Sequence, residues 1–116
     1  MDALNATGYG VVFVTAASQS EATAIATILI EEQLAACINI FPVQSIYQWE
    51  GKIQQESEFQ LVIKTNLAKF AELSSRIQEI HSYEVPEIIA LPIVSGSESY
   101  LGWLGSCLLY TSDAAD

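Results

Sequence analysis

Residues 36–64 read ACINIFPVQSIYQWEGKIQQESEFQLVIK and carry the strongest indication of the fold. Two long runs rich in β-forming residues lie on either side of a Glu-Gly pair at 50–51, which is typical of a turn. The pattern therefore predicts a β-hairpin with strands over residues 36–49 and 52–64. Pro42 cannot donate a hydrogen bond to a neighbouring strand, so it indicates either a bulge or a sheet edge at this point.

The regions around the hairpin supply the remaining elements. A nearly continuous apolar run at residues 10–15 predicts a buried strand. Ser18 stands three residues before Glu21, the spacing of a capping box, and predicts the start of a helix over residues 19–33. A second helix is expected after Asn66, where apolar residues recur at steps of three and four. The last two expected elements are a strand at 87–94 and a short helix at 97–104.

The order βαββαβ plus a terminal helix predicts an α+β, ferredoxin-like fold, with an antiparallel sheet and both main helices on one face. The other face of the sheet then needs a second partner. The composition agrees, because 51% of the residues are hydrophobic, only 16% are charged, and the mean hydropathy is +0.32. We therefore expect a homo-oligomer in which hairpins of neighbouring subunits complete one another's sheets. Tyr47 and Trp49 near the hairpin tip are aromatic anchors typical of interfaces.

Length and charge exclude several classes of protein. The 116 residues predict one domain over residues 1–107 with a loose start at 1–8, while residues 108–116 continue no periodicity and are expected to be a foreign or disordered tail. A net charge of −10 with four cationic residues argues against nucleic acid or an anionic membrane as a partner. No apolar run approaches the roughly 20 residues of a membrane span, and the N-terminus shows no signal-peptide pattern. Two cysteines without a CxxC motif favour a reducing, cytoplasmic setting.

The motif HSYEVPE at residues 81–87 holds the only histidine of the chain, at the expected end of the second helix. A phenol and two carboxylates follow it, and the Val-Pro pair forces the backbone to be extended before the last strand. Imidazole and thiolate groups suit copper, and carboxylates suit harder divalent cations. The candidate metal ligands are His81, Cys37, Glu84 and Glu87.

Structural roles for the same residues stay open. Cys37 begins a strand, where a free thiol usually packs as a small apolar group. His81 in a last helical turn suits a capping or interface hydrogen bond, and Tyr83 and Trp49 suit interface packing. A thiolate–imidazole pair of Cys37 and His81 would be the basis of an enzyme. The sequence shows no nucleophile elbow, metalloprotease helix or Gly-rich phosphate loop, so we expect no catalysis and no catalytic residue.

Three segments, LAACINI at 34–40, SIYQWEGK at 45–52 and HSYEVPEI at 81–88, stand in an order and spacing that resembles the CutA family, the divalent-cation tolerance proteins. The resemblance covers about residues 11–104. It implies a ferredoxin-like fold similar to that of PII signalling proteins, a tight homotrimer, and a link to tolerance of copper and other divalent metals. Some members of the family are reported to bind copper.

The resemblance also implies a cleft between subunits. Besides the candidate metal ligands, this cleft is lined by Tyr47, Trp49, Lys64 and Tyr83. Family members with a proposed copper site carry a cysteine before the Thr-Ala of the first strand and two adjacent histidines at the second helix end. Val14 and Ile80 occupy two of those positions here, so that only His81 carries over. The expected function is a non-catalytic homotrimer that binds copper or another divalent cation weakly. The alternatives are a PII-like small-molecule sensor and a trimeric scaffold without a metal role.

Overall fold

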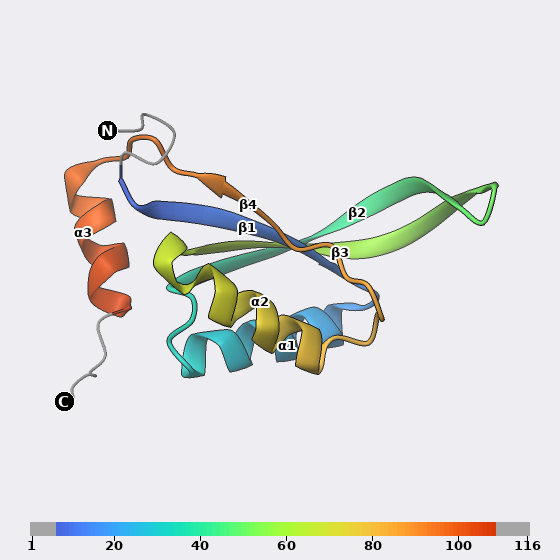
Figure 1. Cartoon of the computed structure of the whole chain (residues 1–116), viewed down its shortest axis with the longest axis horizontal. Helices are drawn as coiled ribbons and strands as arrows, with labels where there is room; N and C mark the ends of the chain where they lie inside the picture. Colours follow the sequence, from blue (N-terminus) through green and yellow to red (C-terminus); the bar gives the residue numbers. More distant parts are fainter. Residues whose placement is uncertain (1–6, 109–116) are drawn as a thin grey trace.

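A computed structural model describes residues 7–108 of the chain. Its elements follow the order βαββαβ plus a terminal helix, which confirms the expected fold class (Figure 1). The elements are β1 (Tyr9–Ala16), α1 (Gln19–Glu31), β2 (Cys37–Trp49), β3 (Lys52–Asn66), a 3₁₀ turn η2 (Leu67–Lys69), α2 (Phe70–Ile80), β4 (Ile89–Pro92) and α3 (Glu98–Cys107).

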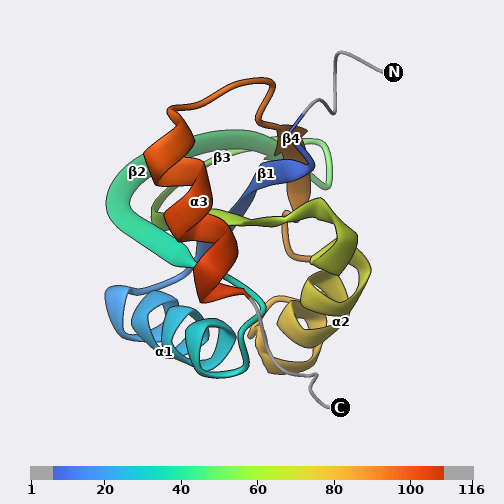
Figure 2. The ribbon, with the colours of Figure 1, turned by 90° about the vertical axis from the view of Figure 1, so that its left-hand side faces the viewer.

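The four strands form one sheet in the order β2-β3-β1-β4, and every neighbouring pair is antiparallel. The helices α1 and α2 lie side by side on one face of this sheet (Figure 2). The third helix, α3, lies across the end of the sheet where β1 begins. The chain is thus a two-layer ferredoxin-like domain with one sheet face free of α1 and α2.

The hydrophobic core fills the space between the sheet and the two main helices. It is formed by alternate residues of β1 and β3 and by the inner faces of α1 and α2: Val12, Val14, Leu61, Ile63, Ile25, Leu29, Leu73 and Ile77. The strand residues recur at a period of two and the helix residues at three and four, because these are the periods that bring side chains to one face. The sequence pattern therefore determines which face of each element is buried.

Both expected N-caps are present, but the first differs from a full capping box. The Ser18 hydroxyl accepts a hydrogen bond from the backbone N–H of Glu21 at 3.1 Å. The Glu21 carboxylate does not return to Ser18 and instead accepts from the backbone N–H of Ala17 at 3.3 Å. The Asn66 side chain accepts from the N–H of Ala68 at 2.8 Å and so caps the 3₁₀ turn that precedes α2.

The β2–β3 hairpin is the longest feature of the molecule, and its end projects beyond the helices (Figure 1). Its register is unbroken from the Cys37–Lys64 pair to the Trp49–Lys52 pair. Pro42 therefore marks an edge strand and not a bulge, since β2 has no neighbour on its outer side within the described residues.

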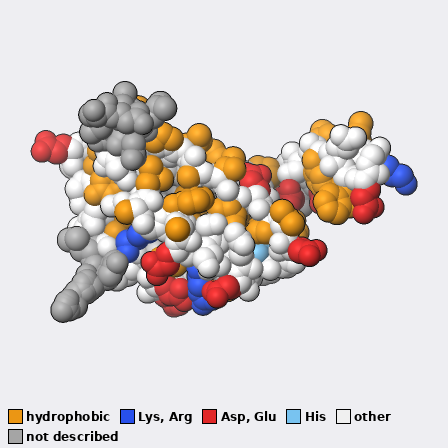
Figure 3. Space-filling model, viewed as in Figure 1, with side chains coloured by type: hydrophobic (Ala, Val, Ile, Leu, Met, Phe, Trp, Pro, Cys, Tyr) orange, Lys and Arg blue, Asp and Glu red, His pale blue; other side chains and the backbone are white. Residues whose placement is uncertain are grey.

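We call the sheet face opposite α1 and α2 the open face. Strand alternation places on it Val11 and Phe13 of β1, Phe41 and Val43 of β2, Val62 of β3, and Ile89 and Leu91 of β4. Phe41 is 45% exposed, and the β4 residues Ile89 and Leu91 are also exposed. In the space-filling view hydrophobic side chains gather over β4 and again at the hairpin end (Figure 3). Within residues 7–108, the helices therefore leave the apolar side chains of Phe41, Ile89 and Leu91 on the open face uncovered.

Two elements differ in length from the sequence expectation. The last strand is confined to Ile89–Pro92, where its residues find partners on β1, instead of extending over residues 87–94. The terminal helix continues to Cys107, and Leu108 closes it as a buried C-cap residue. The sequence predicts a tail from residue 108, whereas the structure includes Leu108 in the packed domain. The rest of that segment and residues 1–6 lie outside the described part of the chain.

Candidate functional site

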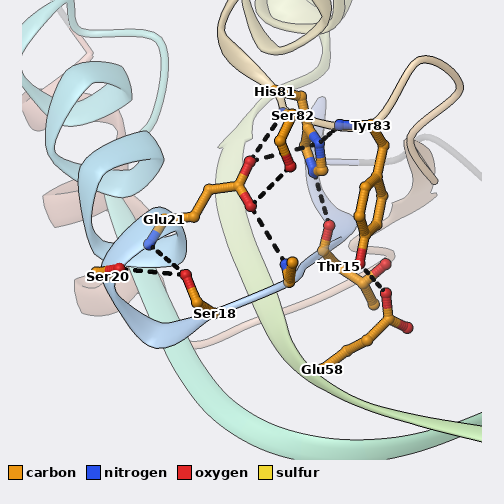
Figure 4. Close-up of polar contacts among 9 residues, drawn as sticks. Thr15, Ser18, Ser20, Glu21, Glu58, His81, Ser82 and Tyr83 are labelled. Carbon is orange, nitrogen blue, oxygen red and sulfur yellow. Dashed lines mark hydrogen bonds and ion pairs between the residues drawn. The ribbon is translucent and has the colours of Figure 1, made fainter.

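The imidazole of His81 lies at the junction between α2 and the segment that leads to β4. Its Nδ1 accepts a hydrogen bond from the backbone N–H of Tyr83 at 3.0 Å, and its Nε2 lies 2.7 Å from the carbonyl oxygen of Thr15 (Figure 4). A carbonyl can only accept, so the ring is the neutral tautomer with its proton on Nε2. The side chain is 0% exposed. The Nε2 bond therefore joins the end of α2 to the end of β1, while the Nδ1 bond holds the turn that follows α2.

The Glu21 carboxylate supports the same junction from the start of α1. It accepts hydrogen bonds from the backbone N–H of Ser82 at 2.8 Å and from the Ser82 hydroxyl at 3.0 Å, and it lies 3.7 Å from His81 Nδ1. Partial burial raises the pKa of Glu21. The hydrogen bonds from Ser82 and Ala17 outweigh burial and hold this pKa below its ordinary value. Sequence reasoning assigned Glu21 only a capping role.

A second polar contact lies beside this junction, on the open face. The Tyr83 hydroxyl donates a hydrogen bond to Glu58 Oε2 at 2.6 Å (Figure 4). Glu58 is only 7% exposed, and burial together with this hydrogen bond and the Glu58 charge raises the pKa of Tyr83. Glu58 was missed by sequence reasoning, because nothing in the polar run around it marks one carboxylate as buried.

Glu87 approaches the same carboxylate from the segment before β4. Burial raises the pKa of Glu87, and the charge of Glu58 raises it further. We call Glu58, Tyr83 and Glu87 the acidic cluster. The ion pairs of the described residues do not involve Glu58. Glu84, another expected ligand, is exposed in the turn beyond His81.

The structure does not bring the expected metal ligands together within one chain. Cys37 pairs with Lys64 in the sheet, whereas His81 contacts Thr15, which pairs with Gln60. Lys64 and Gln60 are four residues apart on β3, which corresponds to about 13 Å along the strand. In residues 7–108 no three His, Cys, Asp or Glu side chains are grouped so that they could hold a metal ion. A site made by several chains stays a prediction.

The other expected cleft residues belong to the hairpin and share the open face. Lys64 Nζ donates to Asn39 Oδ1 at 2.8 Å, and the Tyr47 hydroxyl donates to Glu56 Oε1 at 2.8 Å. The latter hydrogen bond raises the pKa of Tyr47. Trp49 is exposed next to the hairpin turn. These residues follow the length of the hairpin and do not surround one point in the single chain.

Comparison with known proteins identifies the family of the chain. Residues 10–107 match the family described as CutA1 divalent ion tolerance protein. The chain belongs to the CutA family. The CutA protein of Archaeoglobus fulgidus, named a divalent-cation tolerance protein, is 45% identical over 93 residues, which are 80% of this chain and 91% of the relative. The one from Thermus thermophilus, with the same name, is 46% identical over 95 residues, 81% of this chain and 92% of the relative.

Solved CutA structures agree with the fold. The A. fulgidus protein, described there as a periplasmic divalent cation tolerance protein, superimposes with a TM-score of 0.85 at 42% identity and covers 87% of this chain and 99% of its own. The chain spans about half the length of some relatives, such as 52% of the chloroplastic CutA of Arabidopsis thaliana. Within residues 7–108 no helix has the length and apolar character needed to cross a membrane.

Proposed function

We propose that this CutA chain acts as a non-catalytic homotrimer and binds copper or another divalent cation weakly at the cleft between subunits. The observation that carries the proposal is the open face. It presents Phe41, Ile89 and Leu91 to solvent, while α1 and α2 cover the opposite face of the same sheet except along the projecting hairpin end. A sheet that is apolar on both faces favours a two-sided cover, and a second copy of the chain supplies it. The resemblance to the family implies three copies.

The assembly is tested by sedimentation velocity or by size exclusion with light scattering at micromolar concentration. We expect a species of three times the 12.6 kDa chain mass. Each Å² of apolar surface buried between subunits contributes roughly 25 cal/mol, so such an assembly should persist on dilution. A folded 12.6 kDa species throughout the range would overturn the proposal.

Support for the cation comes from the names of the relatives and from the donor groups on the chain. Cys37 is partly exposed, and Glu84 and Glu87 carry carboxylates near the α2 end. His81 can ligate a cation only if it gives up its bond to Thr15 or Tyr83, because both nitrogens are already used. This cost is the physical reason why we propose weak binding.

Calorimetric titration with Cu²⁺ and Zn²⁺, beside titrations with ATP and ADP, separates the functions. Binding heat from a metal and none from the nucleotides supports the proposal, and Cys37→Ser and Glu87→Gln should reduce that heat. Heat from nucleotides alone would favour a PII-like sensor. No binding heat from either metals or nucleotides would favour a scaffold without a metal role.

The absence of catalysis is supported by the separation of the two groups that an enzyme would need. Cys37 and His81 lie about 13 Å apart along the strand direction, so they form no thiolate–imidazole pair within one chain. Alkylation of Cys37 near neutral pH should proceed at the rate of an ordinary thiol. Cys37 and Cys107 are both free in the structure, which supports a reducing, cytoplasmic location.

A further inference from the structure

We propose that the ammonium group of Lys64 in one subunit binds the buried carboxylate of Glu58 in the next, so that a second copy completes the acidic cluster. This inference rests on the proposed homotrimer and goes beyond it by naming the two side chains that meet. It also explains why a single chain holds a buried carboxylate and a half-buried lysine on the same sheet face.

Glu58 lacks the partner that a buried carboxylate normally has. It is 7% exposed and accepts one hydrogen bond in the described structure, from the neutral hydroxyl of Tyr83 at 2.6 Å. Glu87 is close enough that the Glu58 charge contributes to the raised pKa of Glu87. A buried carboxylate without a cation is costly, and a second negative charge nearby increases the cost. The cluster therefore favours a cation.

The chain has four cationic residues to offer. Arg76 already binds Glu32 at 2.9 Å and Glu79 at 3.2 Å. Lys69 lies at the start of α2, away from the open face. The two remaining lysines, Lys52 and Lys64, lie on β3 at positions whose side chains share the open face with Glu58.

Lys64 is the better match because assembly must cover it. It lies beside Val62 and Val11 in the middle of the open face, and its Nζ has one neutral partner, Asn39. An ammonium group carries three N–H donors, so two are left for another acceptor. Covering the apolar residues around it removes water from Lys64 and from Glu58 together. The attraction between the ammonium and carboxylate groups then offsets the cost of removing both charges from water.

Assembly through the middle of the sheet does not need to cover Lys52. It pairs with Trp49 next to the hairpin turn, at the end of the molecule that projects beyond the helices (Figure 1). Its side chain is exposed and can stay hydrated in an assembly that covers the middle of the sheet. Lys52 therefore serves as the matched control for Lys64.

A contact between Glu58 and Lys64 within one chain is excluded by distance. The two residues lie six positions apart on the same strand, which is about 20 Å in extended backbone. Any energetic coupling between them must act across a subunit boundary. A double-mutant cycle therefore reports directly on the proposed contact.

The experiment compares Glu58→Gln, Lys64→Met, the double variant and Lys52→Met by sedimentation equilibrium, with circular dichroism as the check of folding. Glutamine keeps an acceptor for Tyr83, so the local fold is retained. We expect each single change to weaken assembly about tenfold or more per subunit boundary, and the double variant to be no weaker than either. Lys52→Met should leave assembly unchanged.

Mixing the two single variants gives an independent readout. A mixed trimer contains a boundary where an intact Glu58 meets an intact Lys64, so mixed species should form in preference to either pure trimer. Independent, additive effects of the two changes, or a coupling of Glu58 with Lys52 instead, would overturn the inference while the trimer stands. A monomeric wild-type chain would overturn the trimer itself, which is a separate result.

Discussion

At the scale of single residues, His81 is first a structural group, and this has a measurable consequence. We expect His81→Ala to lower the free energy of unfolding by roughly 3 kcal/mol, because it leaves the Thr15 carbonyl and the Tyr83 N–H without partners inside the protein. Thermal unfolding at one fixed protein concentration measures the loss, since assembly makes the melting temperature depend on concentration. Gln78→Ala, at an exposed position of the same helix, is the control. Equal melting of the two variants would contradict the structural role.

Glu21 makes a second residue-scale prediction, this time on pH. Its folded-state pKa is lowered, because hydrogen bonds from Ser82 and Ala17 outweigh the effect of burial. A lowered pKa gives stability that is present above the unfolded pKa of about 4.5 and is lost as pH falls through the lower folded pKa. Glu21→Gln should therefore cost about 1 kcal/mol near neutral pH, after allowance for solvent screening, and progressively less as pH falls below 4.5.

The control for this pH effect is Glu31→Gln, at an exposed position of the same helix. It should change the melting temperature little at either pH. A cost of Glu21→Gln that stays constant from neutral to acidic pH would show that the carboxylate charge is not what holds Ser82.

The same residues show where sequence reasoning stops. The position of His81 at a helix end was predicted from periodicity, because three- and four-residue steps end at Ile80. Its bond to Thr15 spans 66 positions and has no local signal. Glu58 is a similar case, since the alternation of β3 assigns it to the face with Val62, but its hydrogen bond to Tyr83, 25 positions away, has no local signal. Local pattern gives the face of a residue, and long-range contacts give its burial.

At the scale of elements, the hairpin was predictable because its two strands and its turn carry strong local signals. Glu50 and Gly51 both have positive φ angles, 51° and 77°, which is the geometry of a type I′ turn. The end of β4 was less predictable, because its length depends on the partners that β1 offers and not on its own apolar run. The sequence also left open whether Pro42 marks a bulge or a sheet edge, and the strand order shows that it lies on an edge strand.

The turn leads to a prediction with an internal control of opposite sign. Gly51→Ala should destabilise the protein by about 1 kcal/mol, because an alanine at positive φ is strained even though no atom lies within contact distance. Gly102→Ala, in the interior of α3 and also without a close neighbour, should stabilise it by roughly 0.5–1 kcal/mol. Chemical denaturation of both variants measures the difference, and equal shifts would contradict the turn assignment.

At the scale of the whole molecule, the sequence predicted that one sheet face would lack a cover, and the structure confirms that both main helices lie on the other face. How the copies meet could not be predicted, because the contacts between copies have no periodicity in the chain. The open face limits the ways in which the copies can meet. It joins the apolar centre of the sheet to the acidic cluster and to Lys64, so that one surface carries both the hydrophobic driving force and the charges that set its register.

The open face can be tested against another exposed apolar position of similar size. Phe41 on the open face is 45% exposed, and Ile30 on α1 is 40% exposed. Phe41→Glu introduces a charge that assembly would have to bury, so we expect folded 12.6 kDa monomers by light scattering. Ile30→Glu places the same charge on the helix side and should leave the oligomer intact. If Ile30→Glu dissociates the assembly and Phe41→Glu does not, the subunits meet through the helices and the open face is not their interface.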